Sequence, residues 1–201
     1  MPRPRTDIRA RILAAARARF VAAGVDGSPL RRIAADARTS IGMVYYYFPS
    51  KDALFLAVVE EVYVRLLGDL EQALAGPHDF AARLQALYAR IAGASALELD
   101  VVRLVAREAL SSSTRLQSLA VRFSRGHVPL IFQAVGAGVK AGELRQDLHP
   151  AVLMAATIAL GTLPQFALRV VGKSLSLPLP STEQLTRQLA EAVLHGIAAP
   201  R

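Results

Sequence analysis

Residues 28–54 read SPLRRIAADARTSIGMVYYYFPSKDAL, and they are the most informative segment of the 201-residue chain. The Ser28-Pro29 pair predicts a helix start, because the serine oxygen can cap a free backbone N–H and proline presets the first helical φ. We therefore expect a short helix at residues 29–37. A second is expected at residues 40–48, because Pro49 disfavours helical geometry in the residue before it. Two short helices joined by a tight turn form a helix-turn-helix candidate.

The second short helix carries three consecutive tyrosines, Tyr45, Tyr46 and Tyr47. Successive helical residues point about 100° apart, so the three rings cannot all enter one core, and at least one must face outward. An exposed tyrosine can donate its hydroxyl to phosphate and lay its ring along a sugar or a thymine methyl. Lys51 supports this interpretation, because a cation at a helix N-terminus opposes the helix dipole unless an anion binds there.

Basic residues are concentrated in the first quarter of the chain. Residues 1–51 hold ten Lys and Arg against three acids, which places +7 of the net charge of +8 there. Such asymmetry predicts that this part meets a polyanion, either nucleic acid or an anionic membrane. The absence of cysteine excludes disulfide scaffolds, thiolate metal sites and cysteine nucleophiles. The N-terminus lacks the apolar core of a secretory signal, so we expect a cytoplasmic protein.

Helical apolar spacing continues through almost the whole chain, which predicts an all-α fold. Pro129 predicts a kink or a split in one long helix, and Pro164 predicts a bend in the next. The uncharged window Leu148–Leu168 has the length of a bilayer span, but its small residues and prolines suit close packing in a helical bundle better. Besides the two short helices, we expect helices at residues 7–24, 51–74, 79–94, 97–111, 114–141, 147–171 and 181–198.

A wider pattern surrounds the tyrosines. It consists of Ile12-Leu13-x-Ala-Ala, Phe20, Gly24, Ile33-Ala34 and Gly42-x-x-Tyr45-Tyr46-Tyr47-Phe48-Pro49-Ser50-Lys51-Asp52-x-Leu54. This pattern, over about residues 6–60, resembles the tetracycline-repressor (TetR) family of bacterial transcriptional regulators. The resemblance implies a nine-helix homodimer. Residues 1–50 would bind DNA through a helix-turn-helix, and residues 51–201 would bind a ligand and dimerise through the last two helices.

The resemblance also implies which residues touch DNA. Phosphate contacts would come from Ser28, Tyr46, Tyr47 and Lys51, and the major groove would face Ser40, Ile41, Gly42 and Met43, with Tyr45 close to both. Arg3, Arg5 and Arg9 would reach the backbone or the minor groove. The turn departs from the family, which has Gly and then an apolar residue where this chain has Arg38 and Thr39. A left-handed Arg38 would cost on the order of 1 kcal/mol relative to glycine. A different turn geometry is the alternative, and in either case Arg38 and Thr39 are DNA-contact candidates.

Several of these residues also have a purely structural interpretation. We expect a core at Phe20, Leu30, Ile33, Val44 and Phe48, with half of the Tyr45 ring packed on the first helix. Arg17 and Arg19 fit a solvated helix face better than a DNA contact.

Aromatic and polar residues in the downstream helices are candidates for an effector site, since an apolar cavity with a few converging polar groups suits a small molecule. The candidates are Tyr63, Leu66, Leu67, Tyr88, Arg103, Arg107, Phe123, His127 and Phe166. The alternative is that the aromatics are ordinary core and that Arg107, with its neighbour Glu108, is surface. Close dimer packing is expected from Ala155, Ala156, Ala159 and Gly161, and from the apolar stripe Leu185, Leu189, Val193 and Ile197.

Catalytic and metal-binding patterns are missing from the sequence. The four histidines are dispersed, and there is no P-loop, Gly-x-Ser-x-Gly elbow or EF-hand loop. We therefore expect a non-enzyme without cofactor or metal. The resemblance to the TetR family implies a ligand-responsive regulator, most often a repressor that a small apolar effector releases from a palindromic operator, although activation stays open. The rival interpretations are a helical protein bound to anionic membranes and a small helical enzyme.

Overall fold

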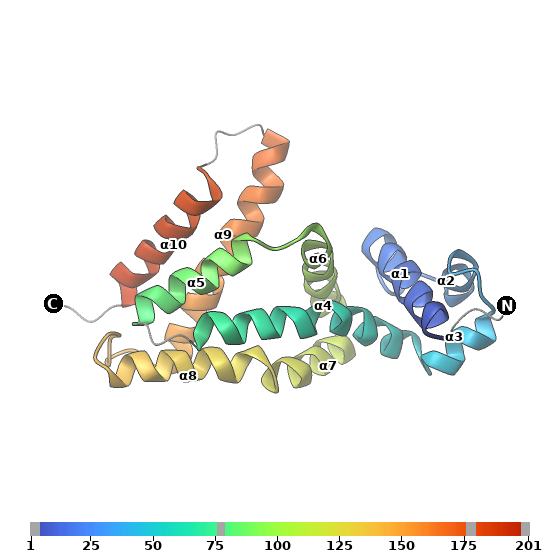
Figure 1. Cartoon of the computed structure of the whole chain (residues 1–201), viewed down its shortest axis with the longest axis horizontal. Helices are drawn as coiled ribbons and strands as arrows, with labels where there is room; N and C mark the ends of the chain where they lie inside the picture. Colours follow the sequence, from blue (N-terminus) through green and yellow to red (C-terminus); the bar gives the residue numbers. More distant parts are fainter. Residues whose placement is uncertain (1–4, 76–78, 176–179, 198–201) are drawn as a thin grey trace. The chain divides into compact units, whose positions relative to one another are not determined.

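The computed structural model describes residues 5–75, 79–175 and 180–197, and these residues form ten α-helices (Figure 1). The all-α prediction is confirmed. The helices are α1 (Arg5–Ala23), α2 (Leu30–Asp36), α3 (Ile41–Tyr47), α4 (Lys51–Leu74), α5 (Phe80–Ala92), α6 (Ala96–Ser111), α7 (Ser113–Ser124), α8 (His127–Lys140), α9 (Pro150–Leu175) and α10 (Thr182–Ile197).

The expected count of nine helices was wrong, because the helix predicted at residues 114–141 is two helices. The chain breaks at Gly126, whose φ of −126° and ψ of −114° are not helical. Pro129 lies in the first turn of α8, where its missing N–H costs no intrahelical bond. The proline therefore belongs to the start of a new helix. A second boundary also moved, since α9 continues through Pro164 and enters the loop expected at residues 172–180.

The chain divides into two compact units. The first holds α1, α2, α3, α4 up to Leu66, α6 and α7 up to Phe123. The second holds the end of α4 together with α5, α8, α9 and α10. The helix-turn-helix candidate therefore belongs to the same unit as α6 and α7.

In the first unit, α1 packs against α2 and α6, and α2 packs against α3. The apolar stripe of α1, Ile12, Leu13, Ala16 and Phe20, is buried, and Gly24 ends the helix with a left-handed φ of 75°. The core prediction is confirmed for Phe20, Ile33, Val44 and Phe48, which are at most 4% exposed, whereas Leu30 is only half-buried. These contacts fix the inner sides of α2 and α3 and leave their outer sides to solvent.

In the second unit, α10 packs against α5 and α9, and α9 also packs against α5 and α8. The phenol of Tyr88 on α5 is fully buried and donates to the carbonyl oxygen of Thr157 at 2.8 Å, and burial raises the pKa of this phenol. Residues Pro150–Leu168 of α9 could cross a membrane by length and composition. Because α9 packs against three helices of its unit, we interpret it as part of this bundle.

Candidate nucleic-acid interface

Helix α3 has a side-chain cap at its N-terminus. The Ser40 hydroxyl oxygen accepts the backbone N–H of Met43 at 3.2 Å, and Val44 is fully buried. With Val44 facing the core, the opposite side of the helix is open. A Cβ added to Gly42 would have only the Ser40 hydroxyl oxygen nearby, at 3.8 Å. The backbone at the start of α3 is therefore accessible to another molecule.

The three tyrosines diverge, as their helical positions require. Tyr45 is 54% exposed and Tyr46 is 65% exposed, while Tyr47 is half-buried. The Tyr46 and Tyr47 ring centroids lie 5.1 Å apart, edge to face, and the Tyr47 ring leans on buried Phe48 at 6.4 Å. The guanidinium of Arg9 lies over the Phe48 ring, 5.6 Å from its centroid. The expectation that the three rings do not share one core is confirmed, and two hydroxyl-bearing rings project from α3.

The turn between α2 and α3 adopts the strained geometry. Arg38 has a φ of 50°, in the left-handed region that favours glycine. The N–H of Thr39 donates to the carbonyl oxygen of Ala34, and the N–H of Arg38 donates to that of Ala35, both at 3.0 Å. These two bonds are those of a Schellman motif, which ends a helix through a left-handed residue. The alternative of a different turn is wrong, and the exposed Arg38 side chain projects from this turn.

Lys51 and Ser28 have different environments. Helix α4 begins at Lys51, as predicted, and the Lys51 ammonium donates to the carbonyl oxygen of Asp26 at 3.3 Å. Ser28 is 1% exposed, and its hydroxyl donates to the carbonyl oxygen of Gly24 at 2.7 Å. The helix cap predicted for Ser28 is wrong, because the N-cap of α2 is Pro29 without a side-chain bond. A buried and engaged hydroxyl is poorly placed for the phosphate contact expected of it.

The other candidates around α3 lie at or near the surface. Arg38, Ser40 and Gly42 are exposed, and Thr39, Ile41 and Met43 are half-buried. Arg3 lies outside the described residues, and the side chain of Arg5 is not described. Arg17 pairs with Glu61 at 2.8 Å and Arg19 pairs with Asp36, in agreement with their interpretation as a solvated face.

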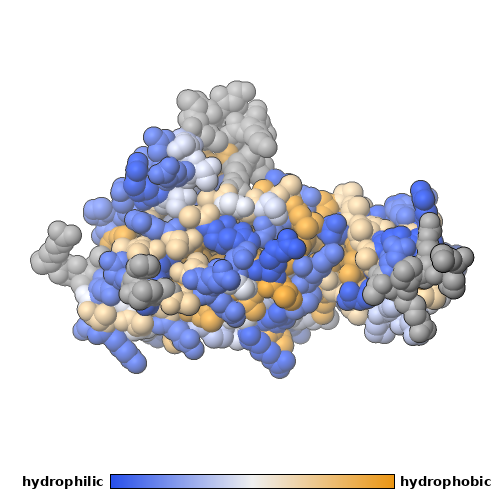
Figure 2. Space-filling model, in the orientation of Figure 1, coloured by the Kyte–Doolittle hydropathy of each residue, from blue (hydrophilic) through white to orange (hydrophobic). Residues whose placement is uncertain are grey.

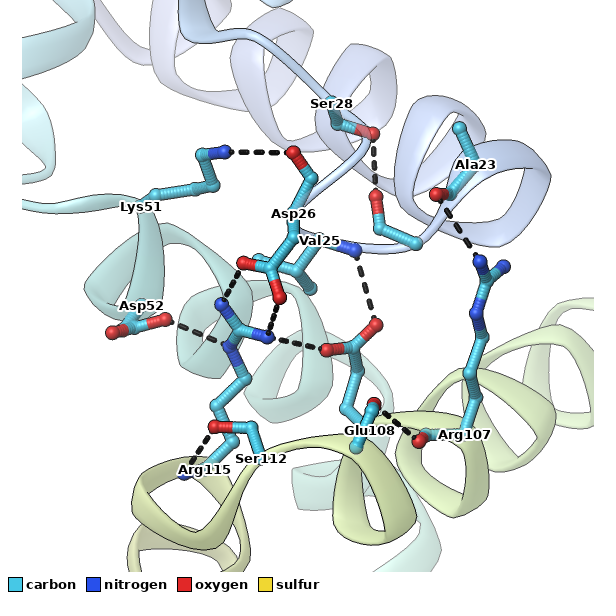
Figure 3. A network of polar contacts seen from close by, with 12 residues as sticks. Ala23, Val25, Asp26, Ser28, Lys51, Asp52, Arg107, Glu108, Ser112 and Arg115 are labelled. Atoms are coloured by element: carbon cyan, nitrogen blue, oxygen red, sulfur yellow. Dashed lines mark hydrogen bonds and ion pairs between the residues drawn. The ribbon is translucent and has the colours of Figure 1, made fainter.

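Sequence reasoning missed a polar network that joins the loop before α2 to α4, α6 and α7 (Figure 3). Its centre is Arg115 of α7, whose side chain is 8% exposed and whose guanidinium pairs with Asp26, Asp52 and Glu108. Glu108 is 2% exposed, so its interpretation as surface was wrong. A signal for its burial was present, because Glu108 shares a helical face with Val101 and Leu104, which are both buried. No comparable local signal joins Arg115 to Asp26, which lies 89 residues earlier.

The effector candidates are distributed over both units. In the first, Tyr63 is buried, its ring centroid lies 5.2 Å from that of Phe123, and the Arg122 guanidinium lies 4.4 Å from its ring. Arg103 is exposed beside Asp100, and Arg107 donates to the carbonyl oxygen of Ala23 at 3.2 Å. The remaining candidates are buried or half-buried within their own units, namely Leu66 in the first and Leu67, Tyr88, His127 and Phe166 in the second.

Comparison with known proteins gives a consistent result. The family described as "Bacterial regulatory proteins, tetR family" matches residues 12–58. Among solved structures, a transcriptional regulator from Streptomyces coelicolor is 25% identical over 96% of this chain and 99% of its own, with a TM-score of 0.67. FadR from Bacillus subtilis, solved with stearoyl-CoA, is 17% identical over 94% and 98%, with a TM-score of 0.76.

The ketosteroid transcriptional regulator KstR2 of Mycobacterium tuberculosis is 19% identical over 100% of this chain and 98% of its own, with a TM-score of 0.65. The comparison with curated proteins gives no match. The matched residues run from the core stripe of α1 through the helix-turn-helix into α4, and the structural neighbours share the fold of the whole chain. The helix-turn-helix region at residues 12–58 therefore belongs to the TetR family of bacterial transcriptional regulators, and the whole chain shares its fold with solved transcriptional regulators.

Proposed function

We propose that this regulator binds a palindromic DNA operator as a homodimer and represses transcription until a small apolar effector releases it. The observation that carries the DNA part is the outer face of α3, where Tyr45 and Tyr46 are more than half exposed beside the open backbone of Gly42. A helix that presents hydroxyls, apolar ring surface and free backbone can approach base edges and phosphates together.

The roles within this face are those that the resemblance to the TetR family implies. Lys51, Arg38, Tyr46 and Tyr47 contact phosphate, and Tyr45 lies between phosphate and groove. The start of α3 faces the major groove through Ser40, Ile41, Gly42 and Met43, with Thr39 at its edge. Arg3, Arg5 and Arg9 extend the contact to the backbone or the minor groove. We leave Ser28 out of this set because its hydroxyl is bonded inside the unit.

A two-fold dimer is expected because one helix-turn-helix contacts too little DNA for tight binding. Helix α9 exposes Val152, Leu160 and Leu163 at 54%, 41% and 66%, and apolar patches lie among hydrophilic residues on the face drawn in Figure 2. The stripe of α10 is partly used within its own unit, since Val193 is 1% exposed and Leu185 and Leu189 are half-buried. We therefore place the dimer contact on α9 and α10, with most of its apolar area on α9.

An apolar effector is supported by two observations of different kinds. Aromatic residues lie inside both units, with Tyr63 beside Phe123 in the first and Tyr88 near α9 in the second. FadR from Bacillus subtilis was solved with stearoyl-CoA, and KstR2 is a ketosteroid regulator. Both ligand classes combine a large apolar body with polar groups. Such a regulator acts on chromosomal DNA and so in the cytoplasm.

The test is selection of bound fragments from a random duplex library with the purified full-length chain. The selected duplexes should share two half-sites related by a dyad, spaced by a turn of DNA or a multiple. Stearoyl-CoA and a 3-ketosteroid are then added separately to the complex as probes, and release by either supports an apolar effector. Selected sites without a dyad would contradict the homodimer on an operator. Tighter DNA binding with a probe, together with transcription that rises when the protein is added, would favour activation.

A further inference from the structure

The loop between α1 and α2 is held by polar contacts from three other helices of the first unit (Figure 3). From α6, Arg107 donates to the carbonyl oxygen of Ala23 at 3.2 Å, and Glu108 accepts the backbone N–H of Val25 at 3.0 Å. From α4, Lys51 donates to the carbonyl oxygen of Asp26 at 3.3 Å. The third helix, α7, supplies Arg115. The loop that leads into the helix-turn-helix is therefore fixed by side chains that lie outside it.

Arg115 makes the largest set of these contacts. Its Nη2 and Nη1 donate to the two carboxylate oxygens of Asp26 at 2.5 and 3.0 Å, in the parallel arrangement that a guanidinium allows. Its Nε donates to Asp52 at 2.8 Å, and its Nη1 also donates to Glu108 at 2.6 Å. The Asp26 side chain is 76% exposed, whereas that of Glu108 is 3% exposed. One guanidinium thus joins a surface acid of the loop to a buried acid of α6.

The two exposed acids that Arg115 contacts, Asp26 and Asp52, flank the helix-turn-helix segment in the sequence. Asp26 lies shortly before α2 begins at Leu30, and Asp52 lies shortly after α3 ends at Tyr47. Arg115 therefore bridges both ends of the helix-turn-helix segment from a helix that is not part of it. The bonds to Asp26 and Asp52 hold these two ends together beside Lys51.

We propose that Arg115 is a positioning residue for DNA binding, which clasps Asp26 and Asp52 and thereby sets where α2 and α3 lie relative to Lys51. The inference rests on the proposed DNA contacts of α3 and Lys51. A clasp made of charged hydrogen bonds has strict geometry, because a lysine at position 115 would keep the charge but lose the planar fork. The Asp26 end of the clasp can be altered without substituting a buried residue, because the Asp26 side chain is 76% exposed.

For the variant Asp26→Asn, a simple charge argument and the proposed clasp predict opposite changes in DNA affinity. Asp26 carries a negative charge close to Lys51, so replacing it with asparagine should strengthen DNA binding if charge alone matters. The clasp predicts that the same replacement weakens DNA binding, because the loop loses its bidentate partner. Asp26→Asn also leaves Arg115 paired with Glu108 and Asp52, so no buried charge is stranded. The sign of the change therefore separates the two explanations.

The experiment measures the affinity of the full-length protein and its variants for one duplex chosen by selection and for one random duplex. The variants are Asp26→Asn and Arg115→Lys, with Arg122→Lys as the matched control. Arg122 lies one heptad further along α7 and forms a bidentate pair with Glu60 at 2.7 and 2.8 Å, away from the helix-turn-helix ends. Thermal unfolding and amide exchange of Val25 and Ser28 are recorded for each protein.

The clasp predicts that Asp26→Asn and Arg115→Lys each weaken binding to the selected duplex by about fivefold or more, within the range of coupling between sites. Binding to the random duplex changes less, because misplaced helices lose base contacts before they lose charge attraction. Exchange of the two loop amides becomes faster, and Arg122→Lys stays within about twofold of the wild type. If folded Asp26→Asn binds the selected duplex as tightly as the wild type or more tightly, the role of Arg115 is overturned and the proposed function still stands. A wild-type protein that binds no duplex overturns the proposed function as well.

Discussion

The guanidinium of Arg11 on α1 donates from Nη1 to the carbonyl oxygen of Ala37 at 2.9 Å, at the last residue before the left-handed turn. The same nitrogen lies 3.4 Å from the carbonyl oxygen of Arg38. A strained residue persists when its surroundings determine its conformation, and here Arg11 of α1 contacts the carbonyl groups on both sides of the strained residue Arg38. The turn geometry therefore depends on a contact that lies outside the helix-turn-helix.

Arg38→Gly should raise the free energy of unfolding by about 1 kcal/mol, because glycine adopts the left-handed conformation without a Cβ clash. It should also weaken DNA binding, because the guanidinium proposed to contact phosphate is lost. Thermal unfolding and a DNA titration measure the two effects, with Arg38→Asn as a control that tolerates the turn without the charge. A variant that is more stable and binds DNA as tightly as the wild type would remove Arg38 from the interface.

Substitutions on α3 should separate phosphate contacts from base contacts. Tyr47→Ala and Lys51→Ala should weaken binding to all duplexes alike, since phosphate carries no sequence information. Met43→Ala should instead change the preference among duplexes, by about 1–3 kcal/mol at one position for a well-made base contact. Competition among duplexes that differ at single positions measures both. A uniform loss from Met43→Ala would contradict its placement in the groove.

Gly161→Ala should destabilise the second unit by about 1–3 kcal/mol, the usual cost of overpacking. A Cβ at this position would lie 2.1 Å from Cε1 of Tyr88, whose fully buried ring has little freedom to move. The matched control is Gly136→Ala on α8, where a Cβ has no atom within 4 Å. That variant should gain about 0.5–1 kcal/mol from helix propensity. Chemical denaturation compares the two, and equal midpoints would show that the close approach of Tyr88 is not rigid.

Stability at low pH should depend on Asp26. The hydrogen bond from Arg115 lowers the pKa of this carboxyl below its ordinary value, so the folded state binds a proton less readily than the unfolded state. The stabilisation is complete above the unfolded pKa of about 3.9 and is lost as the pH falls through the lower folded value. Asp26→Asn should therefore lose less stability than the wild type between about pH 5 and pH 3, as measured by denaturant midpoints. Parallel losses in the two proteins would contradict the contribution of this pair.

The elements that sequence reasoning located well are those with local signals. Ser40 caps α3, Ser50 caps α4 by accepting the N–H of Ala53, and Pro49 separates the two helices, so α3 and α4 begin where they were predicted. Each of these signals acts within four residues. The exposure of Tyr45 and Tyr46 was also predictable, because helical geometry alone prevents three neighbouring rings from sharing one core.

The features that could not be predicted depend on residues far apart in the chain. Ser28 is a strong local capping signal, yet its hydroxyl turns back to Gly24 in a loop that α6 and α7 hold in place. Arginine is a residue type that is mostly exposed, so the sequence gives no sign that Arg115 is buried. Only the fold brings it to Asp26 and Asp52. The apolar stripe of α10 was visible in the sequence. The sequence did not show that α10 packs against α5 within the same unit.

The most direct test of the account is the affinity of the full-length protein for a selected duplex, measured across a series of salt concentrations with the wild type, Tyr46→Ala and Lys51→Gln. We expect wild-type binding that weakens steeply with salt, a loss of affinity in both variants, and a salt slope smaller by about one per DNA-bound protomer for Lys51→Gln. Variants that match the wild type in affinity and in salt slope would contradict the placement of α3 and the start of α4 on DNA.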